Sequence, residues 1–201
     1  MFDFIEGNIQ KISPTHVVIE NAGMGYLLSI SIYTYEKIKS QKLARVFVEQ
    51  TFKVENQNPV GIVLFGFSEP EERAMFRLLT SVSGVGNSTG ILMLSSLDSE
   101  SLSVAILNDN VDLLKSIKGI GEKTAQRIVL ELRDKLGGKK IKGIATMVSP
   151  GVSDAMNEAL SALLSLGYNK GAAEKALMKV SDNGKTTLTV EEFIRNSLKI
   201  L

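Results

Sequence analysis

The 201-residue chain contains no cysteine and only one histidine, His16. Without cysteine it can form neither a disulfide nor a thiolate metal site, and thiol nucleophiles are excluded. No apolar run approaches the ~18 residues of a membrane span, and the chain does not open with a cationic segment followed by an apolar one. These absences predict a cytoplasmic protein that does not enter a membrane.

The chain is also poor in catalytic side chains. His16 falls at a turn or strand start, where an ordinary surface or barrel role is expected, and a nucleophile would have no evident base. No two carboxylates share a convincing metal-ligand spacing outside the solvated faces expected to carry residues such as Glu69, Glu71 and Glu72. We therefore predict a non-catalytic protein with no cofactor and no catalytic metal. Whether a monovalent ion binds near the glycine turns described below stays open.

Neither sign of charge dominates. The 23 Lys and Arg residues nearly balance 22 Asp and Glu residues, for a net charge of +1. This is not the basic excess that would by itself indicate a nucleic-acid binder. The 44 % content of hydrophobic residues indicates a chain that folds into one to three compact units.

Three structured regions and a linker follow one another in a predicted multidomain α+β fold. Residues 1–67 predict a five-stranded barrel of the oligonucleotide-binding type, with an open five-stranded sheet as the alternative. Its expected strands are 2–9, 16–21, 25–31, 45–54 and 61–67.

In residues 68–136 apolar residues recur at the spacing of a helix, which predicts a helical region. Ser68 and Glu71 form an S-x-x-E pattern typical of a capping box. The first expected apolar face consists of Ala74, Met75, Leu78, Leu79 and Val82.

Residues 137–152 predict a flexible, mildly basic linker, because glycines and GGKKIKGIATMVSPG interrupt all periodicity. Residues 153–201 then predict three helices, at 153–166, 170–180 and 190–201. The last is opened by a capping box of Thr189 and Glu192. A module of about fifty residues buries only a marginal core, which suggests that it binds a partner.

The helical region repeats itself. LLTSVSGVGNSTGILMLSSL from Leu78 aligns without a gap with LLKSIKGIGEKTAQRIVLEL from Leu113. A G-x-G turn between two helices, present twice, is much harder to obtain by chance than a single glycine motif. A dinucleotide-binding fingerprint would have to follow a strand, and a P-loop would need a GK[ST] sequence, so neither fits. The pattern predicts two helix-hairpin-helix units, each with an apolar residue plugged between its helices.

A helix that begins right after such a turn presents unpaired backbone N–H groups and a partial positive charge. A phosphate oxygen is the natural ligand, so two units can bind phosphates on both strands of a duplex minor groove without reading bases. A pure scaffold role is the alternative. The predicted DNA-binding residues are Gly84, Val85, Gly86, Asn87, Ser88 and Thr89 in the first copy and Lys118, Gly119, Ile120, Gly121, Glu122, Lys123, Thr124 and Arg127 in the second.

The distribution of charge weakens a simple electrostatic account of this binding. Residues 66–136 contain eight Lys and Arg residues against ten Asp and Glu residues, whereas the chain from Gly137 onward contains nine against six. Affinity must therefore come largely from backbone donors and geometry, summed over several subunits.

The order of barrel, paired hairpins, linker and three-helix module resembles the RuvA family of bacterial Holliday junction branch migration subunits over the whole chain. The motifs that carry the resemblance are FIEGNI, GMGY at 23–26, LFGF at 64–67, the GVG and GIG repeat with KTAQRIVLEL, and ALSALLSLGYNKGAAEKAL at 159–177.

This resemblance implies a homotetramer that holds an open four-way DNA junction on one face, and it leaves open whether four or eight subunits enclose the junction. It also implies recruitment of the hexameric ATPase RuvB by the last module, the resolvase RuvC as a further partner, and roles in recombination, DNA repair and the SOS response.

Two departures from the family pattern stand out. Members carry an acidic pin of adjacent acids at the centre of the tetramer, whereas KVENQNPVGIV offers only Glu55, which is the pin candidate and alternatively an ordinary hairpin residue. The first hairpin has Asn87 and Ser88 where a lysine is expected.

The last module contains an L-x-x-L-G-Y turn like the docking edge of ubiquitin-associated three-helix domains. We expect Leu160 and Leu163 to lie in its core and Leu166, Gly167, Tyr168 and Met178 to bind the ATPase partner.

Two other functional classes compete with a junction binder. Some glycosylases and nucleases hold DNA with a helix-hairpin-helix. Lys123 and Asp134 could be drawn as the catalytic pair of such an enzyme, but they are about three helical turns apart. A protein-only adaptor with the hairpins as scaffold is the other alternative. Incubation with damaged DNA would distinguish the enzyme from the binder.

Overall fold

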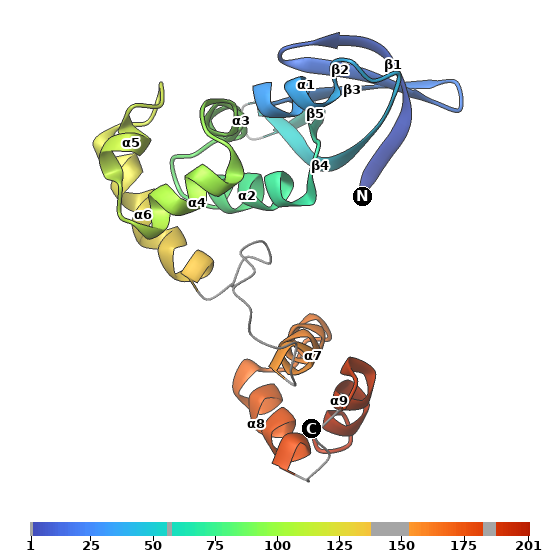
Figure 1. The fold of residues 1–201 in the computed structure, drawn as a ribbon, viewed down its shortest axis with the longest axis vertical. Helices are drawn as coiled ribbons and strands as arrows, with labels where there is room; N and C mark the ends of the chain where they lie inside the picture. Colours follow the sequence, from blue (N-terminus) through green and yellow to red (C-terminus); the bar gives the residue numbers. More distant parts are fainter. Residues whose placement is uncertain (1, 56–57, 138–152, 183–187) are drawn as a thin grey trace. The chain divides into compact units, whose positions relative to one another are not determined.

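The computed structural model divides into two compact units, residues 1–141 and 142–201. It describes residues 2–55, 58–137, 153–182 and 188–201 (Figure 1). The predicted linker therefore lies outside the described residues, except for Gly137, the last residue of α6. A domain boundary between residues 67 and 68 stays a prediction.

Five strands close into a barrel in the order β1-β2-β3-β5-β4, which confirms the prediction of a five-stranded barrel. All pairs are antiparallel except β3 with β5. Alternate residues such as Ile19, Leu28 and Val46 fill the interior, as the period of two in a strand requires. The strands are β1 Phe4–Ser13, β2 His16–Asn21, β3 Met24–Ile30, β4 Leu43–Glu55 and β5 Asn58–Phe67.

A short helix, α1 (Ile32–Ile38), lies between β3 and β4, where no helix was expected. Its N-cap is Ser31, whose hydroxyl accepts the N–H of Thr34. Seven residues are too few to establish a 3.6-residue period in the sequence. The helix forms because this cap and the buried residues Thr34 and Ile38 stabilise it.

The second part of unit 1 is helical, and it shares its core with the end of the barrel. Phe65 and Phe67 of β5 each lie 5.1 Å, between ring centroids, from Phe76 of α2. The helices are α2 Pro70–Thr80, α3 Asn87–Ser96, α4 Ser99–Leu107, α5 Val111–Lys115 and α6 Glu122–Gly137.

The predicted capping box of Ser68 and Glu71 is wrong. The helix begins one residue later than this box requires, at Pro70, and its N-cap is Glu69, which makes no side-chain cap bond. Ser68 instead donates its N–H to Oγ1 of Thr34 at 2.9 Å and, at 3.3 Å, to the carboxylate of Glu72. Of the five residues expected on the apolar face, Met75, Leu79 and Val82 are buried and Leu78 is half-buried. Ala74 is exposed, so its placement on this face is wrong.

Unit 2 is a three-helix module, as predicted. It consists of α7 Ser153–Ser165, α8 Lys170–Asp182 and α9 Val190–Ser197 around a core that includes Leu163, Leu177 and Phe193. The capping box of Thr189 and Glu192 is confirmed in both directions. The last helix ends at Ser197, short of the expected Leu201.

Within the described parts of the chain, no single helix has the length and apolar character to cross a membrane; α3 and α4 meet that test only together, as a pair bent by 97°.

Candidate nucleic-acid interface

The two G-x-G turns have the same backbone hydrogen bonds at positions 35 residues apart. Val85 donates to the carbonyl of Val82 at 3.0 Å, and Ile120 donates to that of Ile117 at 3.1 Å. The following helices close alike, with Gly90 donating to Gly86 and Ala125 to Gly121, both at 2.9 Å. The sequence repeat is therefore a structural repeat, which confirms the tandem helix-hairpin-helix prediction.

The first glycine of each turn has a conformation that other residues rarely adopt. Gly84 has φ +94° and Gly119 has φ +90°. The second glycines, Gly86 and Gly121, lie outside this left-handed region, and a β-carbon added to either would meet no atom within 4 Å. The turn therefore needs glycine at its first position, while the space in front of the second is open.

The middle residues of the turns point inward. Val85 and Ile120 are buried in the helical core together with Val82 and Ile117. This confirms that an apolar residue plugs each hairpin. It also removes the side chains of Val85 and Ile120 from any DNA contact, so only their backbone could contribute.

Each turn leaves backbone N–H groups at the start of a helix. The first bonds of the i to i−4 type are donated by Gly90 and Ala125, so the preceding residues, 87–89 and 122–124, have no such partner in their own helices. The N-cap of α3, Gly86, makes no side-chain cap bond. Both helices can therefore accept an anion at their N-termini.

The second hairpin contacts the turn of the first. Arg127 on α6 donates from Nη1 to the carbonyl of Ser83 at 3.2 Å. The atom closest to a β-carbon placed on Gly84 is Oγ1 of Thr124, at 4.0 Å. These contacts bring the two turns together, and they were not foreseen because they join residues far apart in the sequence.

The first hairpin also contacts the barrel. Asn87 donates its amide to the hydroxyl of Thr51 on β4 at 3.2 Å. Asn87 is half-buried, as is Thr89, whereas Ser88 is exposed. Asn87 thus has a structural partner in addition to its place at the start of α3.

The cations differ in their surroundings. Lys118 and Lys123 are exposed, and among the described residues no ion pair joins either of them to a carboxylate. Lys115 lies 3.0 Å from Asp112 and 3.3 Å from Glu122, and these hydrogen bonds raise its pKa. Lys115 is shared by both acids and offsets only one of their two negative charges, whereas Lys118 and Lys123 remain available for an external anion.

Glu55, the pin candidate, is the last residue of β4 and pairs with Asn58 across the β4–β5 hairpin. Residues 56 and 57 lie outside the described residues. Nearer the barrel, Phe52 pairs with Ile62, and each is 61 % exposed.

In unit 2, Gly167 has φ +93° and connects α7 to α8. Leu166, Tyr168 and Met178 are exposed, whereas Leu163 is buried and Leu160 is half-buried. Their exposure leaves the predicted docking residues accessible in this module.

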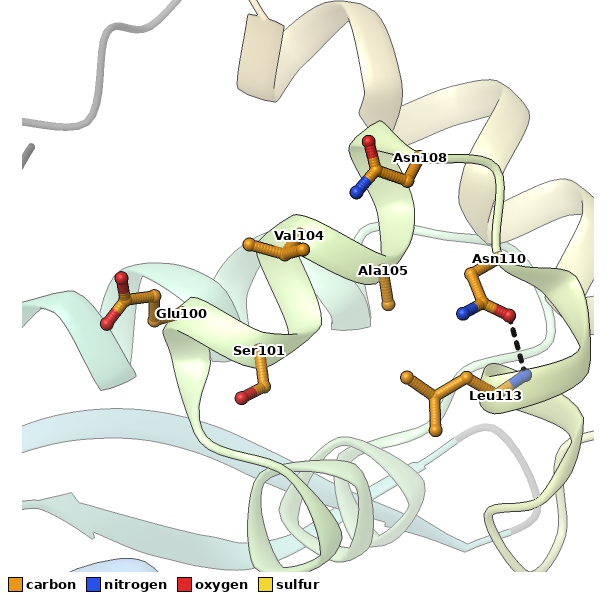
Figure 2. A pocket seen from close by; sticks show the side chains of 7 residues that line it. All are labelled: Glu100, Ser101, Val104, Ala105, Asn108, Asn110 and Leu113. Atoms are coloured by element: carbon orange, nitrogen blue, oxygen red, sulfur yellow. Dashed lines mark hydrogen bonds between the residues drawn. The ribbon is translucent and has the colours of Figure 1, made fainter.

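A cavity of about 400 Å³ is lined by residues of α4 and by Asn108, Asn110 and Leu113, and no residue of the two G-x-G turns lines it (Figure 2). Asn110, the N-cap of α5, accepts the N–H of Leu113 at its wall. The described residues contain no cluster of acids and histidine suited to a metal ion.

Comparison with known proteins agrees with this geometry. A model of the "RuvA N terminal domain" matches residues 1–59, one of the "SAM-like Helix-hairpin-helix tandem" matches 76–134, and one of the "RuvA, C-terminal domain" matches 154–201. Two relatives named Holliday junction branch migration complex subunit RuvA, from Azobacteroides pseudotrichonymphae and Christiangramia forsetii, are 36 % and 39 % identical over 100 % of both chains. A third, from Bacteroides fragilis, is 33 % identical, also over 100 % of both chains. The chain therefore belongs to the RuvA family of Holliday junction branch migration complex subunits, to which the barrel and the paired hairpin turns had pointed.

Proposed function

We propose that this chain binds four-way junction DNA as a homotetramer, holds the junction open and square, and recruits a hexameric RuvB ATPase that supplies ATP hydrolysis for branch migration. The observation that carries the proposal is the pair of equivalent hairpin turns linked by Arg127 and Ser83. The chain itself is the non-catalytic DNA-binding subunit, acting in the cytoplasm in recombination and repair.

The linked turns support binding to duplex arms. Two sets of helix N-terminal N–H groups at a fixed spacing fit phosphates on the two strands of a minor groove. Lys118 and Lys123 add charge at the second turn only. Because backbone donors carry no base information, the chain recognises the shape of DNA and not its sequence.

Assembly supports junction selectivity. A hairpin region with eight cations against ten acids binds one arm weakly, and four copies gain affinity when they bind four arms of one junction. Exposed apolar side chains such as Phe52 and Ile62 on the barrel fit contacts between subunits. Glu55 then lies near the junction centre, where it repels phosphates and helps to separate strands.

The three-helix module binds the ATPase. Leu166, Gly167, Tyr168 and Met178 form its docking edge, since their accessibility leaves an apolar surface for a partner. The resolvase RuvC is a further partner, because it acts on the same junction.

Gel shifts with a synthetic four-way junction and a linear duplex of equal length, across salt concentrations, test the proposal. We expect strong preference for the junction, a tetramer or octamer on it by light scattering, and stimulation of junction unwinding when RuvB and ATP are added. Equal affinity for both DNAs would leave a general duplex binder and overturn the proposal.

A further inference from the structure

Glu72 is a buried carboxylate at the place where the barrel meets the first hairpin. Only 1 % of the residue is exposed, so the expectation that Glu72 lies on a solvated face is wrong. Ser31 and Thr34 donate their hydroxyls to its two oxygens, Thr34 at 2.6 Å, and the N–H of Ser68 lies 3.3 Å away. These partners follow β3 and β5, so Glu72 joins α2 to the ends of two barrel strands.

The direction of these hydrogen bonds is set by the backbone. Ser31 Oγ accepts the N–H of Thr34 at 3.0 Å, and Thr34 Oγ1 accepts the N–H of Ser68 at 2.9 Å. Each hydroxyl then has one proton to donate, and both protons go to Glu72. The site therefore fits a group with two acceptor oxygens, and an amide would leave one hydroxyl proton without an acceptor.

The same short helix, α1, is also tied to its other neighbours. Ile32 donates its N–H to the hydroxyl of Ser95 on α3 at 3.1 Å. Glu69, just before α2, accepts the hydroxyl of Tyr33 at 3.0 Å and lies 3.2 Å from Nζ of Lys37. Helix α1 is thus bonded to both helices of the first hairpin, with Glu72 at the buried centre of the contact.

This network is a poor source of stability. A carboxylate that loses water and gains only neutral donors has a desolvation cost that a well-packed apolar side chain would avoid. What the hydrogen bonds add is direction, because each has a narrow range of favourable angles while apolar contacts do not.

We propose that Glu72 is a positioning residue that, through Ser31 and Thr34, sets the orientation of the paired hairpins against the barrel and thereby the preference for a junction over a linear duplex. The inference rests on the proposed function, since four rigid subunits must present their hairpins at one angle to fit four arms. Binding of a single duplex needs only the hairpin pair and is independent of that angle.

Glu72→Gln and Thr34→Val test this inference, with Glu71→Gln as the matched control, because Glu71 is an exposed acid on the same helix. The ratio of junction affinity to duplex affinity is measured by gel shift for each variant whose circular dichroism matches that of the parent chain. In the two network variants we expect this ratio to fall about tenfold, equivalent to about 1.4 kcal/mol, with duplex affinity unchanged. The control should keep the parent ratio.

Spin labels provide a readout of the angle itself. The chain has no cysteine, so Gln10→Cys on β1 and Gln126→Cys on α6, both exposed, can be labelled uniquely. The distance distribution between the labels should broaden or shift in Glu72→Gln and in Thr34→Val but not in Glu71→Gln.

Parent-like ratios and distances in both folded network variants would overturn the inference, as would equal losses of junction and duplex binding, which indicate general damage. If the parent chain itself showed no junction preference, the proposed function would fail instead. Thr34→Val keeps the test valid if Glu72→Gln does not fold, because it removes one hydroxyl and leaves the carboxylate in place.

Discussion

Arg127 on α6 donates a hydrogen bond of 3.2 Å to the backbone carbonyl of Ser83, in the turn of the other hairpin. The two residues are 44 positions apart, and their contact joins the two helix N-termini that we assign to phosphate binding. The carbonyl belongs to the backbone and cannot be removed by a substitution, so the contact is tested by replacing Arg127.

Arg127→Ala should weaken duplex binding without changing its salt dependence, because the arginine acts by holding the first turn in place. A residue that neutralises a phosphate contributes about 0.9 to the slope of log affinity against log salt concentration. The measurement is a salt titration of duplex binding. A slope reduced by about one unit would instead identify Arg127 as a phosphate ligand.

Lys123→Ala should behave in the opposite way. Lys123 is exposed beside the second turn, and its loss should reduce the salt slope by about 0.9 with no change in stability. Gln126→Ala, an exposed neutral neighbour, serves as the control. Ser88→Lys, which places a lysine at the equivalent position of the first hairpin, should raise the salt slope by a similar amount. If neither Lys123→Ala nor Ser88→Lys changed the slope, DNA would not bind at these two turns.

The two glycines of the second turn should separate folding from binding. Gly119→Ala forces an alanine into φ +90°, which should lower the free energy of unfolding by about 1–2 kcal/mol. Gly121→Val should change the free energy of unfolding by less than about 0.5 kcal/mol, because a β-carbon at this position meets no atom within 4 Å.

Gly121→Val should nevertheless bind duplex DNA more weakly, since the side chain would occupy the space in front of the helix N-terminus. The turn itself should tolerate the change, because its left-handed position is Gly119 and not Gly121. Urea unfolding and gel shifts together test the pair. Unimpaired DNA binding by a stable Gly121→Val variant would rule out phosphate contact at this turn.

Stability should depend on pH through Glu72. Burial raises the pKa of Glu72, against the opposing effect of hydrogen bonds from Ser31, Thr34 and Ser68. The folded chain then binds this proton more tightly than the unfolded chain, whose glutamate has a pKa of about 4.3. The stabilising contribution of protonated Glu72 is therefore fully present below the pKa of the unfolded glutamate. It is lost as the pH rises through the higher pKa of Glu72 in the folded chain.

Urea unfolding of the parent chain and of Glu72→Gln between pH 4 and 7 tests the predicted direction of this pH dependence. The parent should lose stability relative to the variant as pH rises. Because Glu69 lies close by with Tyr33 and Lys37, the comparison is repeated in a Glu69→Gln background. A difference that grows in favour of the parent with rising pH would contradict the prediction.

Met178→Ser in the last module should abolish or strongly weaken binding of the RuvB ATPase while leaving junction binding intact. Met178 is exposed, so the free energy of unfolding should change by less than about 0.5 kcal/mol. Lys179→Ser, an exposed neighbour on α8, is the matched control for a pull-down with RuvB. Equal binding by both variants would move the docking surface away from this edge.

Much of the molecule could be predicted from local patterns. The repeat of Leu78–Leu97 in Leu113–Leu132 predicted both hairpins, because each turn is formed by residues within one short stretch, and glycine alone tolerates its left-handed position. The capping box of Thr189 and Glu192 was confirmed for the same reason: its two partners are three residues apart.

Patterns failed where a distant partner decided the local structure. Ser68 and Glu71 fit a capping box, but Pro70 begins α2 and Ser68 bonds to Glu72. Helix α1 was missed because its stability comes from a cap and from buried contacts and not from a long period.

The sequence by itself therefore determined the five strands, the duplicated turns and the three-helix module, since alternation and turn residues act over a few positions. Only the tertiary structure decided the contact of Arg127 with Ser83 and the burial of Glu72 among Ser31, Thr34 and Ser68. These interactions join residues up to 44 positions apart. The periodicity of a short segment cannot predict which distant donors and acceptors come together when the chain folds.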